Sequence, residues 1–405
     1  MIDIHIPKGR KKMKENEKIF DEEPEELASA DTKTDIPEKS KKKKMKKWKK
    51  ALLIIFLTLL GLTIVAAVAG LLYFNYLLNR ITPYDTANDA TVSTVEAEQI
   101  ILDDPEAVTV GDDEDIPDLP ELTAPDENTQ EGNTVTGELT PDNKVPLVNG
   151  EHLLNILLVG QDRRPGEGRQ RSDSMMLVTF NKSQNTITLT SFMRDSHVTI
   201  PGYKSNKLNA AYAFGGMKLL NDTLYQNFGV VVDGDVEVDF GKFEQLIDLL
   251  GGVDITLTKK EAKWVNSFDK NNPVTEGRYR LNGKQALAYS RLRAIDSDYN
   301  RANRQRKVIE SLIQRYKSQS VSEMVALMDD ILPLVVTNME KGEIVDHLME
   351  FAPMLSGATI NTMQIPAHGT FKGGKARVRP GLAAWFQYNI DFNENRRLLN
   401  EIFAK

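Results

Sequence analysis

The chain has 405 residues, a formal net charge of −7, five histidines and no cysteine. This length suits one large domain or two ordinary ones. Without cysteine, a disulfide framework and a thiolate metal site are both excluded. The histidines are scattered and show no H-E-x-x-H spacing, which argues against a zinc enzyme.

Residues 1–50 form a polar, basic tail. Residues 1–38 carry mixed charge with almost no apolar periodicity, which is typical of a disordered segment. Residues 39–50 (KSKKKKMKKWKK) contain nine lysines. Such a run can bind anionic lipid or nucleic acid, but next to an apolar segment it indicates a stop-transfer signal. Because nucleic-acid binding asks for a basic folded domain, we expect no nucleic-acid partner.

An uncharged apolar run follows the lysines and predicts a membrane anchor at residues 51–76. At 1.5 Å per residue, such a helix spans the roughly 30 Å hydrocarbon layer of a bilayer. A cleaved signal peptide is the alternative, because Ala67-Val68-Ala69 resembles a cleavage site. The long polar tail and the continuation of the run past that site favour an uncleaved, single-pass anchor in the cell membrane. The lysines predict a cytoplasmic N-terminus, with everything after residue 80 extracytoplasmic.

The next segment, residues 77–150, is acidic. Residues 81–150 carry eighteen Asp or Glu and one basic residue, Lys144, and they are rich in Pro, Thr and Asn. This composition predicts a self-repelling, extended linker between the anchor and a folded domain.

Residues 151–405 have the pattern of a globular α/β domain. Short apolar segments closed by Gly, Asn or a charged loop predict strands at 153–160, 174–180 and 186–192. A helix with a Gly-Gly interruption is expected at 207–228, and a β-α-β unit at 235–257. Further elements are expected in this order: helices at 285–292, 300–316, 322–336 and 343–355, then a last apolar segment at 359–366. Together they predict a central mixed β-sheet flanked by helices on both faces.

Three polar clusters interrupt these apolar elements, and the first is residues 160–176. Asp162 follows one predicted strand and Asp173 precedes the next. Two carboxylates on adjacent strand ends suit a hard cation such as Mg²⁺. A charged surface hairpin explains the same residues, and this cluster alone leaves both interpretations open.

The second cluster, residues 191–202, begins where the third predicted strand ends. Arg194 and Asp195 lie just past that strand, where open α/β sheets bind their ligands. The alternative is a local structural ion pair, which is the commoner explanation for an Arg-Asp dipeptide.

The third cluster runs from Tyr289 to Arg306. If residues 300–318 form a helix, its apolar residues make one stripe that faces inward. Arg301, Arg304 and Gln305 lie three or four positions before members of this stripe, so they are on the same inward side. Inward guanidinium groups need anions as partners. The segment therefore predicts a phosphate or diphosphate site, with Arg306 left at the surface.

The rest of the third cluster precedes the helix. Arg291, Arg293 and Asp298 lie before or at its first turn. Arginines together with Mg²⁺ provide the charge neutralisation that phosphoryl transfer requires. No G-x-x-x-x-G-K-[ST] sequence is present, so a nucleoside triphosphate is not the expected substrate. A diphosphate outside the cytoplasmic membrane favours a lipid-carried substrate.

The chain from about residue 152 to 318, and more loosely to 405, resembles the LytR-CpsA-Psr family of cell-envelope proteins. The matching blocks are NILLVGQD, RSDSMMLVTFN, SFMRDSHVTIPG, KLNAAYAFGG, LIDLLGGVDI, LNGKQALAYSRLR and DSDYNRANRQR. The resemblance implies an enzyme that moves a glycopolymer, such as teichoic acid or capsule, from an undecaprenyl diphosphate carrier to peptidoglycan. This phosphotransferase would form a phosphodiester and release undecaprenyl phosphate.

The resemblance also implies site residues, block by block. Asp162 and Asp173 would hold Mg²⁺ as the cofactor. Arg194, Asp195 and Asp298 would be catalytic. The diphosphate would be bound by Arg171, Arg194, Arg291, Arg293, Arg301 and Gln305. The usual proline of the S-I-P-R-D block is replaced by Met193, while its arginine and aspartate are present. The proton acceptor is left open among Asp173, Asp195 and Asp298.

Two other functions compete with this interpretation. A polyprenyl-diphosphate phosphatase or pyrophosphatase would use the same arginines with water as acceptor. A non-enzymatic, membrane-bound regulator is the third possibility. The helices at 322–336 and 343–355 can line a groove for the lipid, although Met and Leu at this spacing more often form plain core.

Overall fold

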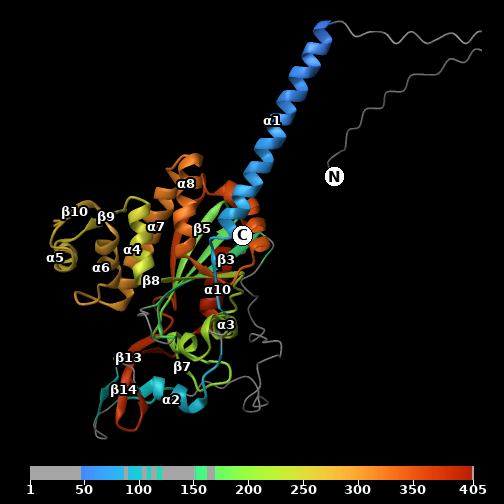
Figure 1. Ribbon diagram of the computed structural model, residues 1–405. Helices are drawn as coiled ribbons and strands as arrows, with labels where there is room; N and C mark the ends of the chain where they lie inside the picture. Colours follow the sequence, from blue (N-terminus) through green and yellow to red (C-terminus); the bar gives the residue numbers. More distant parts are fainter. Residues whose placement is uncertain are drawn as a thin grey trace, which may run out of the picture. The chain divides into compact units, whose positions relative to one another are not determined.

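The structure is a computed structural model that describes residues 47–85, 90–102, 107–110, 116–120, 150, 152–161 and 169–403. Its contacts divide the chain into two units, Met1–Val65 and Ala66–Lys405. The first unit contributes the beginning of helix α1 (Lys47–Leu78). All other described elements belong to the second unit (Figure 1).

Helix α1 contains a 29-residue stretch, Lys50–Leu78, that is long and apolar enough to cross a membrane. The predicted anchor at 51–76 lies within it. Most of its described leucine, isoleucine and valine side chains are exposed. Leu77 and Leu78, at the end of the helix, belong to the second unit and are buried within it.

A seven-stranded mixed sheet forms the centre of the second unit, in the order β1-β11-β8-β3-β4-β5-β12. The pairs β1–β11, β3–β8 and β5–β12 are parallel, whereas β8–β11, β3–β4 and β4–β5 are antiparallel. The strands are β1 (Thr82–Pro83), β3 (Leu153–Gln161), β4 (Ser172–Asn181), β5 (Thr186–Phe192), β8 (Gly234–Asp239), β11 (Val336–Thr337) and β12 (Thr359–Ile365).

Helices cover both faces of this sheet because its strands carry apolar residues on both sides. Helices α3 (Leu208–Phe228) and α10 (Phe392–Phe403) pack with the face that carries Leu157 and Leu177. Helix α7 (Asp298–Lys317) packs through Ile309 and Ile313 on the opposite face. On that face, alternate residues of β4 and β5 point toward α7: Met176, Val178, Ile187 and Leu189. The predicted fold class is therefore confirmed.

The Gly-Gly interruption predicted in the first long helix is present in α3. Gly215 and Gly216 leave the helical conformation, and Gly216 has a φ of 67°. A side chain at Gly216 would be strained in this left-handed region. The kink lets the two halves of α3 pack at different angles on the same core.

The predicted β-α-β unit at 235–257 is wrong in one respect. Strand β8 and helix α4 (Phe240–Leu249) form as expected, but β9 (Val253–Leu257) does not join the central sheet. It pairs with β10 (Gly277–Leu281) in a separate two-stranded sheet. Gly251 and Gly252, with φ of 76° and 90°, redirect the chain after α4 in a way that other residues rarely adopt.

This two-stranded sheet belongs to a side lobe with its own apolar core. Its helices are α4, α5 (Lys259–Phe268) and α6 (Gly283–Arg291), and they lie together beside the sheet in Figure 1. Capping boxes begin two of them: Thr258 with Glu261 for α5, and Asn282 with Gln285 for α6. The inner stripe of α7 completes the core of the lobe.

The helix predicted at 322–336 ends earlier than expected. Helix α8 covers Val321–Ile331, a 3₁₀ turn follows at Leu332–Leu334, and the next residues form β11. Pro333 explains the change, because proline removes a helical hydrogen bond and favours the first turn of a new element. Helix α9 (Lys341–Phe351) and a second 3₁₀ turn (Ala352–Met354) come next.

The described residues of the acidic segment 77–150 are not an extended linker. Strand β1 pairs with β11, and β2 (Val108–Thr109) pairs with β14 (Leu382–Tyr388). Helix α2 (Thr94–Leu102) lies between them in sequence, and Tyr84 and Ala97 are buried in the main core. Burial of these few apolar side chains outweighs the repulsion expected from composition alone.

Two further small sheets lie outside the central one. Strand β13 (Lys372–Arg379) completes the three-stranded sheet, and β6 (His197–Val198) pairs with β7 (Asn206–Lys207).

Candidate active site

The strand ends of the central sheet gather polar side chains at one edge. Strands β3, β5, β8 and β12 run in the same direction and end there, while the antiparallel β4 begins there. Helix α6 ends and α7 begins beside the same edge, which brings the arginine-rich segment to it. This is the position where open α/β sheets bind ligands.

An ion-pair cluster of Arg194, Asp173, Asp298, Asp195 and Arg301 lies at this edge. Arg194 Nη1 donates to Asp173 Oδ1 at 3.0 Å, and Arg194 Nε lies 3.6 Å from Asp195 Oδ2 and 3.7 Å from Asp298 Oδ1. Arg301 Nη2 lies 2.7 Å from Asp298 Oδ1 and donates to the carbonyl oxygen of Asp173 at 3.3 Å. The structure thus brings together residues predicted from all three sequence clusters.

Charged side chains of both signs surround Arg301. Burial lowers the pKa of Arg301, Asp298 opposes this shift, and the neighbouring guanidinium groups of Arg194 and Arg293 add to it. A buried arginine surrounded by other arginines gains from an additional anion. The five residues of the cluster carry two positive and three negative formal charges, so an anion binds here only with the help of further basic side chains nearby, such as Arg293.

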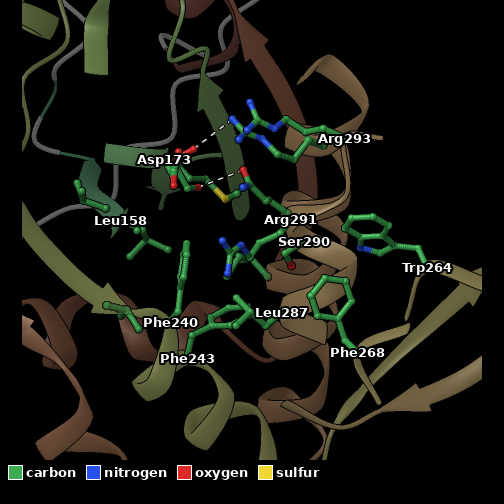
Figure 2. A pocket seen from close by; sticks show the side chains of 18 of the residues that line it. Leu158, Asp173, Phe240, Phe243, Trp264, Phe268, Leu287, Ser290, Arg291 and Arg293 are labelled. Carbon is green, nitrogen blue, oxygen red and sulfur yellow. Dashed lines mark hydrogen bonds between the residues drawn. The ribbon is translucent and has the colours of Figure 1, made fainter. Parts of the chain in front are cut away.

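A cavity of about 520 Å³ opens next to the cluster (Figure 2). Figure 2 shows Asp173 and Arg293 at one end of it, and Phe243 and Phe268 at the other. Gln305 also lines the polar end, where its Oε1 accepts a hydrogen bond from Ser174 Oγ at 3.2 Å. The cavity can hold a ligand that is anionic at one end and apolar along the rest.

Arg291 lies between the two ends of this cavity. Its guanidinium carbon is 4.6 Å from the centre of the Phe240 ring. This cation–π contact holds the charged group over an aromatic wall. Arg291 and Arg293, two residues apart where α6 ends, both line the cavity.

The apolar wall comes from helices that the sequence did not single out. It is formed by α4, α5 and α6 through Phe240, Phe243, Trp264, Phe268 and Leu287. No described residue of the helices predicted at 322–336 and 343–355 lines this cavity. Leu327 and Ile331 of α8 pack on the core of the side lobe instead, so their apolar stripe serves the fold.

Lys207 is a member of the site that sequence reasoning missed. Its side chain is only 2% exposed, and its Nζ lies 3.2 Å from Asp195 Oδ1 and 5.3 Å from the centre of the Phe386 ring. No local signal marks it, because a lysine at the N-terminus of a helix is usually solvent-exposed. Lys207 neutralises Asp195 on the side away from Arg194.

Arg304 shares the inward stripe of α7 but does not reach the cavity. Its Nε donates to Glu261 Oε1 at 2.8 Å, its Nη1 donates to the carbonyl oxygen of Leu292 at 2.8 Å, and its Nη2 binds Asp296. Burial raises the pKa of Glu261, but hydrogen bonds from Arg304 and Thr258 outweigh it, so that the net pKa is lowered. Arg304 therefore stabilises the junction between α5, α7 and the preceding turn.

The prediction that Arg306 lies at the surface is wrong. The residue is 5% exposed, and burial lowers the pKa of its guanidinium. Its helical position falls on the same side as Ile309 and Ile313, which face the sheet. The apolar face of α7 is wider than the stripe used to assign its orientation, whereas the next residue, Lys307, is exposed.

Two predicted site residues remain, Arg171 and Asp162. Arg171 Nη2 donates to the carbonyl oxygen of Ile100 in α2 at 2.7 Å, and Arg171 does not line the described cavities. Asp162 lies outside the described residues. Over the part of the chain that the structure describes, no group of three or more His, Asp or Glu side chains is arranged to hold a metal ion.

Comparison with known proteins identifies relatives for most of the second unit. The model of the LytR_cpsA_psr family matches residues 124–383. The polyisoprenyl-teichoic acid–peptidoglycan teichoic acid transferase TagT of Bacillus subtilis (strain 168) is 35% identical over 199 residues, which cover 47% of this chain and 60% of TagT. The regulatory protein MsrR of Staphylococcus aureus (strain Mu50 / ATCC 700699) is 38% identical over 168 residues, which cover 41% of this chain and 50% of MsrR. The chain thus spans about half to three fifths of these relatives.

A solved structure, described as TagT bound to LI-WTA, has a similar fold. It superposes with a TM-score of 0.51 and 26% sequence identity, over 63% of this chain and 92% of that chain. The mixed sheet with helices on both faces is therefore a known arrangement.

Proposed function

Since the chain belongs to the LytR-CpsA-Psr family, we propose that it is a membrane-anchored phosphotransferase. It transfers a glycopolymer from an undecaprenyl diphosphate carrier to peptidoglycan, forms a phosphodiester and releases undecaprenyl phosphate. The observation that carries this proposal is the cavity in which an apolar wall ends at a group of arginines. The transferase activity named for TagT, which is similar over 47% of this chain, supports it.

The donor binds with its diphosphate at the polar end of the cavity. Arg293 and Arg301 line that end, Arg291 lies next to it along the cavity, and Arg194 extends the positive charge from β5. Guanidinium groups bind phosphate oxygens through paired donors. The isoprenoid chain lies along the aromatic wall formed by α4, α5 and α6, where it is removed from water.

The reaction replaces the phosphoanhydride bond of the donor by a phosphate ester bond to the acceptor. An acceptor hydroxyl oxygen forms a bond to the phosphorus that carries the glycan, and the bond from that phosphorus to the lipid phosphate breaks. The electron pair leaves with undecaprenyl phosphate, whose charge Arg194, Arg291 and Arg301 stabilise.

Asp298 accepts the proton of the acceptor hydroxyl in this scheme. Its side chain is 21% exposed, whereas that of Asp195 is 7% exposed and lies between Lys207 and Arg194. A proton acceptor must reach the substrate hydroxyl, which favours Asp298. Asp195 then acts by holding Arg194 in place.

Mg²⁺ is the proposed cofactor, held by Asp173 together with Asp162. Asp173 supports this role because its carboxylate lines the cavity and is one-third exposed, and because carboxylate oxygens suit a hard cation. When bound, the ion would neutralise charge on the diphosphate. Asp173 also accepts a hydrogen bond from Arg194, so it connects the proposed cation site to the arginines.

The proposed location is the cell membrane, with the domain on its outer side. The apolar stretch Lys50–Leu78 supports an anchor, and the lysines before it favour a cytoplasmic N-terminus. A reporter enzyme fused after Lys405 tests this orientation. Reporter activity on the cytoplasmic side would exclude a transferase that acts on peptidoglycan.

Transfer itself is tested with the full-length chain in detergent, a polyprenyl-diphosphate glycan, Mg²⁺ and peptidoglycan oligomers. We expect a phosphodiester-linked product and free polyprenyl phosphate in equal amounts. A phosphatase or pyrophosphatase would release glycan phosphate even when peptidoglycan is present.

A regulator is the second candidate function, and the name of the relative MsrR is the observation in its favour. Arg301→Ala separates the two functions, because a non-enzymatic regulator does not depend on a buried diphosphate ligand. Loss of transfer together with the cellular phenotype supports the enzyme. A phenotype retained by a variant without transfer supports the regulator.

A further inference from the structure

A second cavity, of about 640 Å³, lies beside the first, and Arg293 lines both. We propose that this second cavity is the subsite for the acceptor sugar, with Trp385 as the surface on which the sugar ring stacks. The proposal rests on the transferase function above and adds where its second substrate binds.

The ion-pair cluster separates the two cavities. Asp173 and Arg301 line the first cavity, and Arg194 and Asp298 line the second. The pairs Arg194–Asp173 at 3.0 Å and Arg301–Asp298 at 2.7 Å connect the two linings. A diphosphate held by these arginines is thus accessible from both sides.

Phosphoryl transfer requires the attacking and leaving oxygens to lie roughly in line with phosphorus. The leaving lipid phosphate is drawn toward the apolar wall of the first cavity. The attacking hydroxyl must then approach from the opposite side, which is the second cavity. Asp298 lines that cavity and can take the proton as the new phosphorus–oxygen bond forms.

The lining of the second cavity suits a sugar better than a lipid. Both polar side chains and aromatic rings line it, among them Gln387 and His368, and Trp385 and Tyr299. Trp385 is 51% exposed and Tyr299 is 43% exposed. A pyranose ring presents an apolar C–H face to an aromatic ring and hydroxyls to polar groups, so both kinds of residue contribute to binding it.

Strand β14 positions Trp385 relative to the ion-pair cluster. Two residues along that strand, the backbone N–H of Gln387 donates to the carbonyl oxygen of Asp195 at 2.9 Å. The Gln387 side-chain oxygen accepts from Ser196 Oγ at 3.2 Å. Asp195 and Ser196, which follow Arg194, are therefore hydrogen-bonded to the strand that carries the exposed tryptophan.

The test measures steady-state transfer by the full-length chain with donor and acceptor varied separately. Trp385→Ala is expected to raise KM for peptidoglycan oligomers about tenfold. The KM for the donor should stay within about twofold of the wild-type value. The same holds for the rate of any slow hydrolysis of the donor, measured without acceptor as release of polyprenyl phosphate. Trp385→Phe, which keeps an aromatic face, recovers most of the acceptor affinity.

Phe268→Ala is the matched control, because Phe268 is an aromatic residue of similar exposure, 45%, in the first cavity. It is expected to raise the donor KM and leave the acceptor KM unchanged. A Trp385→Ala variant that raises the donor KM instead would assign the second cavity to the donor glycan and overturn the proposal.

Direct binding of peptidoglycan oligomers, measured by calorimetry without donor, separates this proposal from the proposed function. An unchanged Kd in Trp385→Ala overturns the acceptor subsite even where transfer is intact. Wild-type protein that binds oligomers but transfers nothing, with binding weakened by Trp385→Ala, supports the subsite and overturns the transferase function.

Discussion

The Nη1 atom of Arg194 lies 3.0 Å from Oδ1 of Asp173, so the residues at the end of β5 and the start of β4 form one ion pair. This contact joins the proposed metal ligand to a proposed catalytic arginine. A change at either residue therefore affects both the cation and the diphosphate.

Asp173→Asn is expected to lower kcat for transfer at least about 100-fold. Asparagine keeps an oxygen that accepts from Arg194, but it lacks the charge that holds a cation. The free energy of unfolding should change little, because the side chain is one-third exposed. Full activity in Asp173→Asn, with loss only in Asp173→Ala, would leave Asp173 merely a positioning partner of Arg194.

Metal removal gives a related prediction. Incubation with EDTA is expected to abolish transfer, and added Mg²⁺ should restore it. In Asp173→Asn the Mg²⁺ concentration for half-maximal rate should rise about tenfold or more. Transfer that continues undiminished in EDTA would contradict the proposed cofactor.

Arg301→Lys tests whether charge alone is sufficient at the centre of the cluster. Lysine keeps a positive charge, but it cannot bind Asp298 and the Asp173 carbonyl oxygen with the same planar donors. We expect kcat/KM for the donor to fall about 100-fold. A variant within a few-fold of wild type would mean that Arg301 makes no directed contact with the diphosphate.

Arg304→Ala is expected to destabilise the fold by about 3 kcal/mol or more, because it leaves the carboxylates of Glu261 and Asp296 without their buried partner. Urea denaturation measures the change. Arg397→Ala is the matched control, since Arg397 also contacts two carboxylates but at the exposed surface of α10. The urea midpoint of Arg397→Ala should stay close to that of the wild type. An equal loss of unfolding free energy in both variants would refute the difference predicted between the buried and the exposed arginine.

The free energy of unfolding should decrease as the pH is lowered, because of His197. Burial lowers the pKa of His197 to about 4, whereas the unfolded side chain titrates near pH 6.5. Between these values the unfolded state binds more protons, so the contribution of His197 is complete above about pH 6.5 and is lost as pH falls to 4. The total is about 3 kcal/mol. His197→Gln should flatten the dependence of unfolding free energy on pH in this window, and an unchanged slope would assign it to other groups.

Much of the candidate site follows from helical periodicity. Gln305 and Arg301 line the same cavity because both fall on the inward stripe of α7. Arg304 falls on that stripe too, yet it contacts Glu261 instead of the cavity. Periodicity gives the direction of a side chain, but the neighbouring element decides whether it meets a ligand or a structural partner.

The errors have tertiary causes. Strand β9 has the composition of any buried strand, and only the turn at Gly251 and Gly252 removes it from the central sheet. Lys207 and Trp385 lie far from the arginine-rich segment in sequence, and the fold alone brings them beside it. Long-range placement of this kind leaves no local pattern in a single chain.

The pairing of β1 with β11 and of β2 with β14 decides where a soluble version of this protein can begin. A protein shortened to start at residue 150 would lose an edge strand from each of two sheets, together with the buried Tyr84 and Ala97. Unpaired sheet edges and newly exposed core favour association between molecules. Secretion or purification of the domain should therefore succeed only when the chain is cut within α1, before Leu77, so that the acidic segment travels with the fold it completes.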